Sequence, residues 1–358
     1  MTLQYNDGFD WVDTTNDASV RAQLAYDAWT VTVPFNAAET TMGGGAGLYG
    51  GKYLAYINSG GNGPLKVLRA TTARQTAYRG FRFYATGLPA TSNEIFAFTD
   101  AGSVQVVLRL LGTGAVAVYR GTTLLGTSAS SLIAINTWYF IEFGAKIDPS
   151  TGTYDVRING VSVLSGTGAN TRNTANSTSD GFCWGRNFST DLSNLSANVQ
   201  FRFDDIYAVD DQGSVNNNFL GDCRTEMLVP NANSGAQGFT PSAGSNYQCV
   251  DEIPLSATAD YNAASAAAED RFTTAGMATT PTSVYGVSLV QFSLKTDAGA
   301  NTSRNRLTSG GTTGNGTTTA VPTSIGAIRD VFELNPNGSI AWTPTAVNAA
   351  LPGYERVT

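Results

Sequence analysis

Histidine is absent from the 358 residues of the chain. A catalytic triad and a cysteine–histidine pair are therefore excluded, and so is a zinc or copper ion held by imidazole. The chain also lacks the side chain that usually changes charge near neutral pH. Much of the chemistry that enzymes use is thus missing, and the sequence predicts a protein that is not an enzyme and has no cofactor.

Charged side chains are scarce, at 14% of the residues, against roughly 25% in ordinary soluble domains. The basic residues are scattered and mostly arginine, the lysines being Lys52, Lys66, Lys146 and Lys295. Because the net charge is −7 and the isoelectric point about 4.7, nucleic acid is not expected as a partner. A surface rich in Thr, Ser, Asn and Gly is typical of extracellular or assembled β proteins.

Long apolar runs are also missing. No window approaches the ~18 apolar residues of a membrane span, and residues 1–11 lack the basic segment and apolar core of a secretion signal. What is present is enough apolar material for folded cores, with 42% hydrophobic and 10% aromatic residues. The length suggests about two domains.

The cysteines are Cys183, Cys223 and Cys249, an odd number without a CxxC pair, so zinc is not expected. A disulfide between Cys223 and Cys249 would close a loop of about 25 residues and stabilise the fold by roughly 3 kcal/mol. The alternative is that all three are small buried hydrophobic side chains. This alternative is favoured, because the sequence does not show whether the two Cβ atoms meet.

Short segments with alternating apolar and polar residues indicate β-strands through the first two thirds of the chain. Strands are expected at 78–84, 104–110, 137–143 and 153–158, and Asn159–Gly160 is a strong hairpin signal. Since the first part shows no convincing helix, an antiparallel sandwich is predicted. The composition changes at residues 210–214, which places a domain boundary near residue 212.

The region after residue 212 also shows strand patterns. Its one helical candidate is the alanine-rich segment 263–269, and 343–350 is a candidate terminal helical turn with Pro344 near its first position. The polar tract 296–319 is expected to form a long hairpin or loop.

Carboxylates were considered as catalytic or metal-binding groups. Glycoside hydrolysis needs two carboxylates facing one cleft, but Glu142 and Asp148 are separated by an expected turn, and Asp251 and Glu252 are adjacent, so no pair fits. Asp204 and Asp205 are weak candidates for calcium ligands. The favoured interpretation is that one faces solvent and the other caps a loop, because the chain has no DxDxDG loop.

Tryptophans are the candidates for stacking on a sugar. Trp138 and Trp184 are chosen for this role, since an aromatic ring presents a flat apolar face with a polar edge. The alternative is that these rings fill the core, and strand alternation around Trp138 favours that alternative.

Several segments resemble known families. Residues 137–142 (TWYFIE), 156–160 (VRING) and 203–207 (FDDIY) resemble concanavalin A-like and laminin-G-like jelly rolls. Later segments resemble, in their order along the chain, a family of tailed-bacteriophage virion proteins. These segments are Asn217–Arg224, Leu228–Asn231, Phe239–Ser242, Val250–Glu252, Asp270–Phe272, Val284–Val287 and Ala341–Thr343.

The resemblance implies an all-β chain with a concanavalin A-like jelly roll over residues 1–212 and a second, smaller β-sandwich over 213–358. It implies a structural protein on the surface of a virion, as a capsid decoration, collar or fibre, assembled in the bacterial host cytoplasm. Its partners would be major capsid, neck or tail proteins and further copies of itself, for example in a trimer. The alternative function is a carbohydrate-binding module of a tail fibre that recognises a host surface glycan. A third alternative, with less support, is a polysaccharide depolymerase.

Overall fold

The computed structural model describes residues 2–32, 40–58, 65–186, 195–196, 198–256 and 259–358. It is 51% strand and 6% helix, and its antiparallel sheets form sandwich-like folds. The predicted all-β class is therefore confirmed. The chain divides into two compact units, the first formed by Met1–Phe9 and Thr14–Thr225 and the second by Asp10–Asp13 and Glu226–Thr358.

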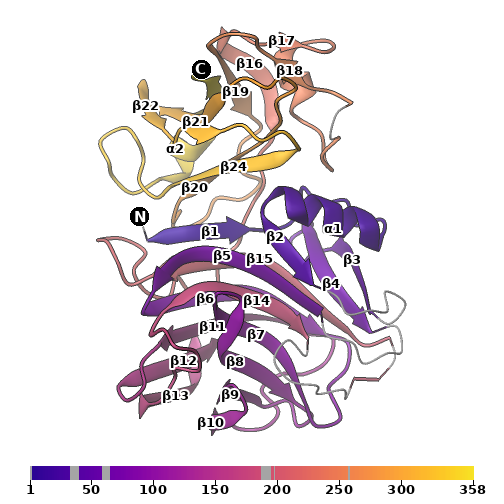
Figure 1. Cartoon of the computed structure of the whole chain (residues 1–358), viewed down its shortest axis with the longest axis vertical. Helices are drawn as coiled ribbons and strands as arrows, with labels where there is room; N and C mark the ends of the chain where they lie inside the picture. Colours follow the sequence, from indigo (N-terminus) through magenta and orange to yellow (C-terminus); the bar gives the residue numbers. More distant parts are fainter. Residues whose placement is uncertain (1, 33–39, 59–64, 187–194, 197, 257–258) are drawn as a thin grey trace. The chain divides into compact units, whose positions relative to one another are not determined.

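The first unit is built from two antiparallel sheets (Figure 1). The larger sheet runs in the order β13 (Val161–Ala169), β12 (Gly152–Ile158), β11 (Trp138–Lys146), β6 (Thr76–Ala85), β15 (Gln200–Asp210), β4 (Lys52–Asn58) and β3 (Thr40–Ala46), with β1 (Leu3–Asp7) also paired to β15. The smaller sheet runs in the order β10 (Thr123–Thr127), β9 (Val116–Arg120), β8 (Ser103–Leu111), β7 (Ser92–Asp100), β14 (Ser179–Arg186), β5 (Leu65–Arg74) and β2 (Trp29–Thr32).

Aromatic rings fill the space between these sheets. Phe81 of the larger sheet stacks on Phe96 of the smaller one with ring centroids 4.6 Å apart, and Phe143 lies 5.0 Å from Phe98. Such pairs bury large apolar areas and add specific ring contacts. The inward positions alternate with outward positions along each strand, so the larger sheet has a second, outer face that is free to carry polar groups.

The hairpin predicted at Asn159–Gly160 is present between β12 and β13, with positive φ angles of 49° and 81° at the two residues. The first unit also contains a helix that the strand patterns did not indicate, α1 (Asp17–Tyr26). Its N-cap Asn16 accepts a hydrogen bond from the backbone N–H of Ser19, 2.9 Å away.

The second unit has one main sheet, two strand pairs and short helical turns. The main sheet runs in the order β16 (Pro230–Gln237), β19 (Ala268–Thr274), β25 (Leu351–Arg356), β21 (Thr302–Ser309) and β22 (Thr312–Asn315), with β23 (Thr319–Ala320) also paired to β21. The strand pairs are β17 (Thr240–Pro241) with β18 (Asn262–Ala263), and β20 (Val287–Ser293) with β24 (Gly326–Phe332), and the helical turns are η1 (Asn246–Cys249) and α2 (Pro344–Asn348).

The helix expected over 263–269 is wrong, because this segment contributes to strands β18 and β19. The alanine-rich composition favours a helix locally, but pairing of β19 with β16 and β25 overrides it. The expected terminal turn is present as α2, with Pro344 at its start. Within the described residues, neither helix has the length and apolar character that a membrane crossing requires.

Candidate functional site

The outer face of the larger sheet in the first unit brings aromatic, charged and small residues together. On β6 and its neighbours the register places Tyr78 opposite Gly144 of β11, and Gly144 opposite Asp155 of β12. A row across three strands therefore runs from an aromatic ring, over a glycine, to a carboxylate. Because the glycine has no side chain, the middle of this row has room for a ring from another segment.

A segment formed by residues 213–225, called the covering segment below, crosses this face. Its Gly221 N–H donates to Glu142 Oε1 at 2.8 Å, and Arg82 Nη2 donates to the carbonyl of Cys223 at 3.1 Å. The expected boundary at residue 212 leaves these residues outside the jelly roll, whereas their bonds to β6 and β11 tie them to the first unit. The segment covers part of the outer face and forms one wall of a hollow.

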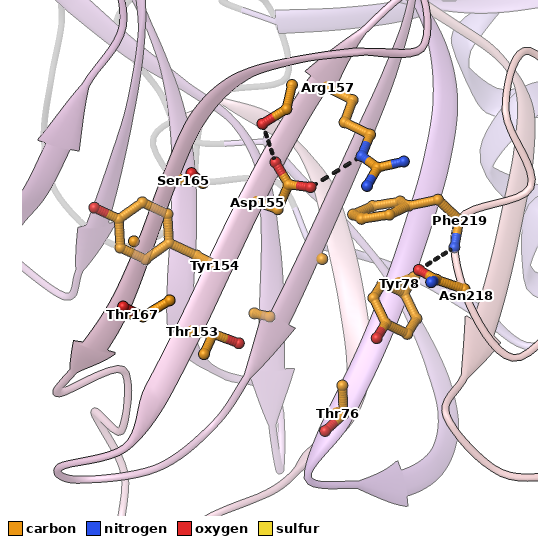
Figure 2. Close-up of a pocket in the computed structure, with 14 residues that line it drawn as sticks. Thr76, Tyr78, Thr153, Tyr154, Asp155, Arg157, Ser165, Thr167, Asn218 and Phe219 are labelled. Atoms are coloured by element: carbon orange, nitrogen blue, oxygen red, sulfur yellow. Dashed lines mark hydrogen bonds and ion pairs between the residues drawn. The ribbon is translucent and has the colours of Figure 1, made fainter.

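The hollow beside the covering segment has a volume of about 340 Å³ (Figure 2). Its lining comes from β6, β11, β12, β13 and the covering segment: Thr76, Tyr78, Gly144, Ala145, Thr153, Tyr154, Asp155, Arg157, Ser162, Ser165, Gly166, Thr167, Asn218 and Phe219. Hydroxyl and amide groups dominate the list, and three aromatic rings and one ion pair accompany them.

Phe219 is the centre of a short column of planar groups. The Phe219 ring lies 4.8 Å from the Tyr78 ring at an interplanar angle of 64°, and Arg157 Cζ lies 4.1 Å from the Phe219 centroid. A Cβ added at Gly144 would come within 2.6 Å of Phe219 Cζ, so the glycine is what lets the ring approach the sheet. The column offers apolar edges and faces at the wall of the hollow.

The polar groups of the hollow are held in place by their own contacts. Arg157 Nε donates to Asp155 Oδ2 at 2.9 Å, and Ser162 Oγ donates to Asp155 Oδ1 at 2.6 Å (Figure 2). Burial, and secondarily the charge of Asp211, raises the pKa of Tyr78, so its hydroxyl stays protonated at neutral pH. An open hollow with rings and oriented polar groups suits a ligand that is rich in hydroxyls.

Trp138 lies on the same outer face, at the opposite end of β6 from Tyr78. It pairs across strands with Tyr84. Its ring centroid lies 5.2 Å from that of Tyr84 and 5.9 Å from that of Tyr53. Trp138 and Tyr84 are half-buried, so this predicted stacking residue stands in a surface cluster of rings.

Trp184 does not share this position. It is 0% exposed and packs 4.7 Å from Phe203 in the interior. Trp184 therefore fills the core, which is the interpretation favoured from the sequence, and no ligand ring can reach this fully buried side chain. Both tryptophans lie in strands, and the sequence did not show which faces outward.

Asp204 and Asp205 are engaged within the protein. Asp205 Oδ2 accepts a hydrogen bond from Arg82 Nε at 2.8 Å, and its Oδ1 accepts one from the N–H of Thr225 at 2.8 Å. Asp204 Oδ1 accepts the N–H of Asp205. In the described ranges, no group of three or more His, Cys, Asp or Glu side chains is placed to hold a metal ion. The geometry therefore fits ion pairing and backbone capping.

All three cysteines are free thiols in the structure. Cys223 belongs to the first unit and Cys249 to the second, and the bridge considered between them is not formed. Cys183 is fully buried, and burial raises its pKa to about 12. Cys249 is buried as well, with its Sγ 3.1 Å from the carbonyl of Ala243.

Comparison with known proteins assigns the chain to no family. No family model matches the chain, and no curated protein matches it. Among solved structures, a sialidase aligns with 12% identity and a TM-score of 0.41, over 57% of this chain and only 18% of the sialidase. An endo-β-1,4-glucuronan lyase from the fungus Trichoderma reesei aligns with 15% identity and a TM-score of 0.37, over 58% of this chain and 95% of the lyase. An alginate lyase aligns with 13% identity and a TM-score of 0.39, over 58% of this chain and 98% of the lyase.

The lyases contradict the prediction that this chain is not an enzyme, and that prediction is corrected. It rested on missing histidine and on the lack of a suitably spaced carboxylate pair, yet structures with a similar sandwich carry the names of lyases. At these identities and TM-scores the likeness establishes no activity for this chain.

Some lining residues of the hollow were within reach of sequence reasoning. The predicted strand 153–158 alternates, and a period of two puts Asp155 and Arg157 on the face opposite to Val156. Phe219 was not within reach, because it lies in a segment without strand pattern and reaches the hollow only through the fold.

Proposed function

We propose that the first unit binds carbohydrate in the hollow on the outer face of its larger sheet. The observation that carries the proposal is the column of Arg157, Phe219 and Tyr78 beside a wall of hydroxyl groups. Aromatic rings pack against the C–H faces of a sugar, while fixed hydroxyl, carboxylate and guanidinium groups exchange hydrogen bonds with its hydroxyls.

The test is a glycan array that spans neutral and acidic glycans, followed by titration of the best ligand. We expect retention of at least one glycan class by the wild type and about tenfold weaker binding by Tyr78→Ala, the equivalent of ~1.4 kcal/mol. Tyr261→Ala is the matched control, since Tyr261 is 53% exposed in the second unit. An array without any bound glycan, or equal losses in the two variants, would contradict the proposal.

We also propose that the chain is exposed on a bacteriophage particle, where it contacts other virion proteins and further copies of itself. The support is the order of the segments that resemble phage virion proteins, from 217–224 to 341–343. A carbohydrate-binding unit at such a position would recognise a host surface glycan. Antibodies against the purified chain should label purified phage particles in electron micrographs, and unlabelled particles would contradict this placement.

A further inference from the structure

The outer face of the larger sheet carries a second cluster of aromatic and charged groups, at the end of β6 away from the hollow. It consists of Tyr53, Tyr84, Trp138 and Arg202, and is called the Arg202 cluster below. These residues come from β4, β6, β11 and β15. Strand register brings them together, since Tyr84 lies opposite both Trp138 and Arg202.

The guanidinium of Arg202 is held between two rings. Its Cζ lies 4.6 Å from the Tyr53 centroid and 4.5 Å from the Tyr84 centroid. Arg202 Nε and Nη2 donate to Gln200 Oε1 at 3.2 and 3.1 Å. The rings and the amide together fix the orientation of the guanidinium and leave its Nη1 edge for another acceptor.

The charge of Arg202 has no carboxylate partner in the described part of the chain. This distinguishes it from Arg82 and Arg157 on the same face, which pair with Asp205 and Asp155 at 2.8 and 2.9 Å. The acceptor that Arg202 does contact, the Gln200 amide, is neutral. A fixed and uncompensated guanidinium next to a half-buried tryptophan is complementary to a flat ligand with a negative charge.

We infer that the Arg202 cluster binds an acidic sugar, with the Trp138 ring against the sugar ring and Arg202 donating to the carboxylate of the sugar. The inference rests on the proposed carbohydrate binding and adds the class of sugar. A carboxylate is favoured because its planar pair of oxygens matches the donor edge of a guanidinium. With the hollow, the outer face would hold two sites for one polysaccharide, which strengthens binding of long chains.

The first experiment changes the ligand and leaves the protein intact. Binding of the wild type to polygalacturonate is compared with binding to the same polymer after reduction of its carboxylates to alcohols, and to a sulfated polysaccharide. We expect the reduced polymer to bind about tenfold more weakly. Equal affinity for the native and reduced polymers would overturn the inference, and so would preference for the sulfated one.

The second experiment changes the cluster. Arg202→Gln should weaken binding to polygalacturonate about tenfold and make the affinity less dependent on salt. Arg202→Lys keeps the charge and should lose less affinity. Arg120→Gln, on the smaller sheet, makes the same change in net charge and should leave binding unchanged. Thermal melts confirm folding of each variant. If Arg202→Gln binds like Arg120→Gln while the wild type retains the polymer, the acidic-sugar site is absent but carbohydrate binding stands. If no glycan binds the wild type, the proposed function itself fails.

Discussion

The two units share the all-β class, but their interiors are built from different groups. In the first unit, rings such as Phe81, Phe96 and Trp184 are 0% exposed, and ring contacts cross the sandwich from Phe81 to Phe96 and from Trp184 to Phe203. In the second unit the hydrophobic cluster around Leu307 and Trp342 is small. The first interior is thus specified by apolar area, and the second depends more heavily on the bonds of buried polar side chains.

Asp270 shows how the second unit uses such bonds. It is 0% exposed. Its Oδ1 accepts the N–H groups of Gly238 and Phe239, and its Oδ2 accepts from Asn246 Nδ2 at 2.8 Å and from the Tyr354 hydroxyl at 3.2 Å. One carboxylate therefore links β19 and β25 to the loop at residues 238–239 and to the helical turn η1. Burial, with the charge of Asp270 as a second cause, raises the pKa of Tyr354, so its hydroxyl remains a donor.

The largest effect is expected from removing a ring in the first unit. Phe96→Ala should lower the free energy of unfolding by about 4 kcal/mol, because it deletes a buried ring and leaves a cavity. Hydrogen exchange measured by mass spectrometry should rise in β7, β8 and β14 and stay unchanged in β19 and β25. Leu124→Ala is the control, since Leu124 is 52% exposed. Similar losses of stability in the two variants would contradict the claim that buried rings hold the first unit together.

A smaller effect is expected from the buried carboxylate of the second unit. Asp270→Ala removes the acceptor of four hydrogen bonds and should cost roughly 3 kcal/mol, with faster hydrogen exchange in β19 and β25. Asp270→Asn retains an oxygen for Gly238 and Phe239 and should lose less. If Asp270→Ala and Asp270→Asn are both as stable as the wild type, buried polar bonding does not hold this unit together.

The comparison also explains how much could be predicted from the sequence. In the first unit, alternation located the strands around Phe81 and Val156, because burial on one face leaves a period of two. The alternation pattern did not reveal α1, although Asn16 is a typical N-cap residue and Val20 and Leu24 stand at helical spacing. In the second unit, polar residues such as Asp270 occupy interior positions, so apolar periodicity did not separate strand from helix over 263–269.

The candidate sites divide in a similar way. Core filling was the favoured interpretation for both tryptophans, yet Trp138 is half-buried on the outer face while Trp184 fills the core. A strand pattern gives alternation but not which of its two faces is covered. Arg202 stands in strand β15, and its lack of a carboxylate partner among the described residues is a property of the folded sheet. Residues that act through long-range contacts, such as Phe219, need the structure.

The smallest effect is expected for Asp148, an exposed carboxylate that accepts backbone N–H groups as the buried Asp270 does. Asp148 lies in the turn between β11 and β12. Its carboxylate Oδ1 accepts the N–H groups of Thr151 at 2.7 Å and Ser150 at 2.8 Å, and these bonds lower its pKa to about 2. A lowered pKa means that the stabilisation is present at neutral pH and is lost as the pH falls from about 4 through 2. The melting temperature of Asp148→Ala should therefore lie slightly below that of the wild type at pH 7, and the difference should shrink as the pH falls below 4 and be lost below pH 2. Since solvent competes for this exposed carboxylate, a loss as large as that of Asp270→Ala would show that the position of the bond, rather than its burial, sets its contribution.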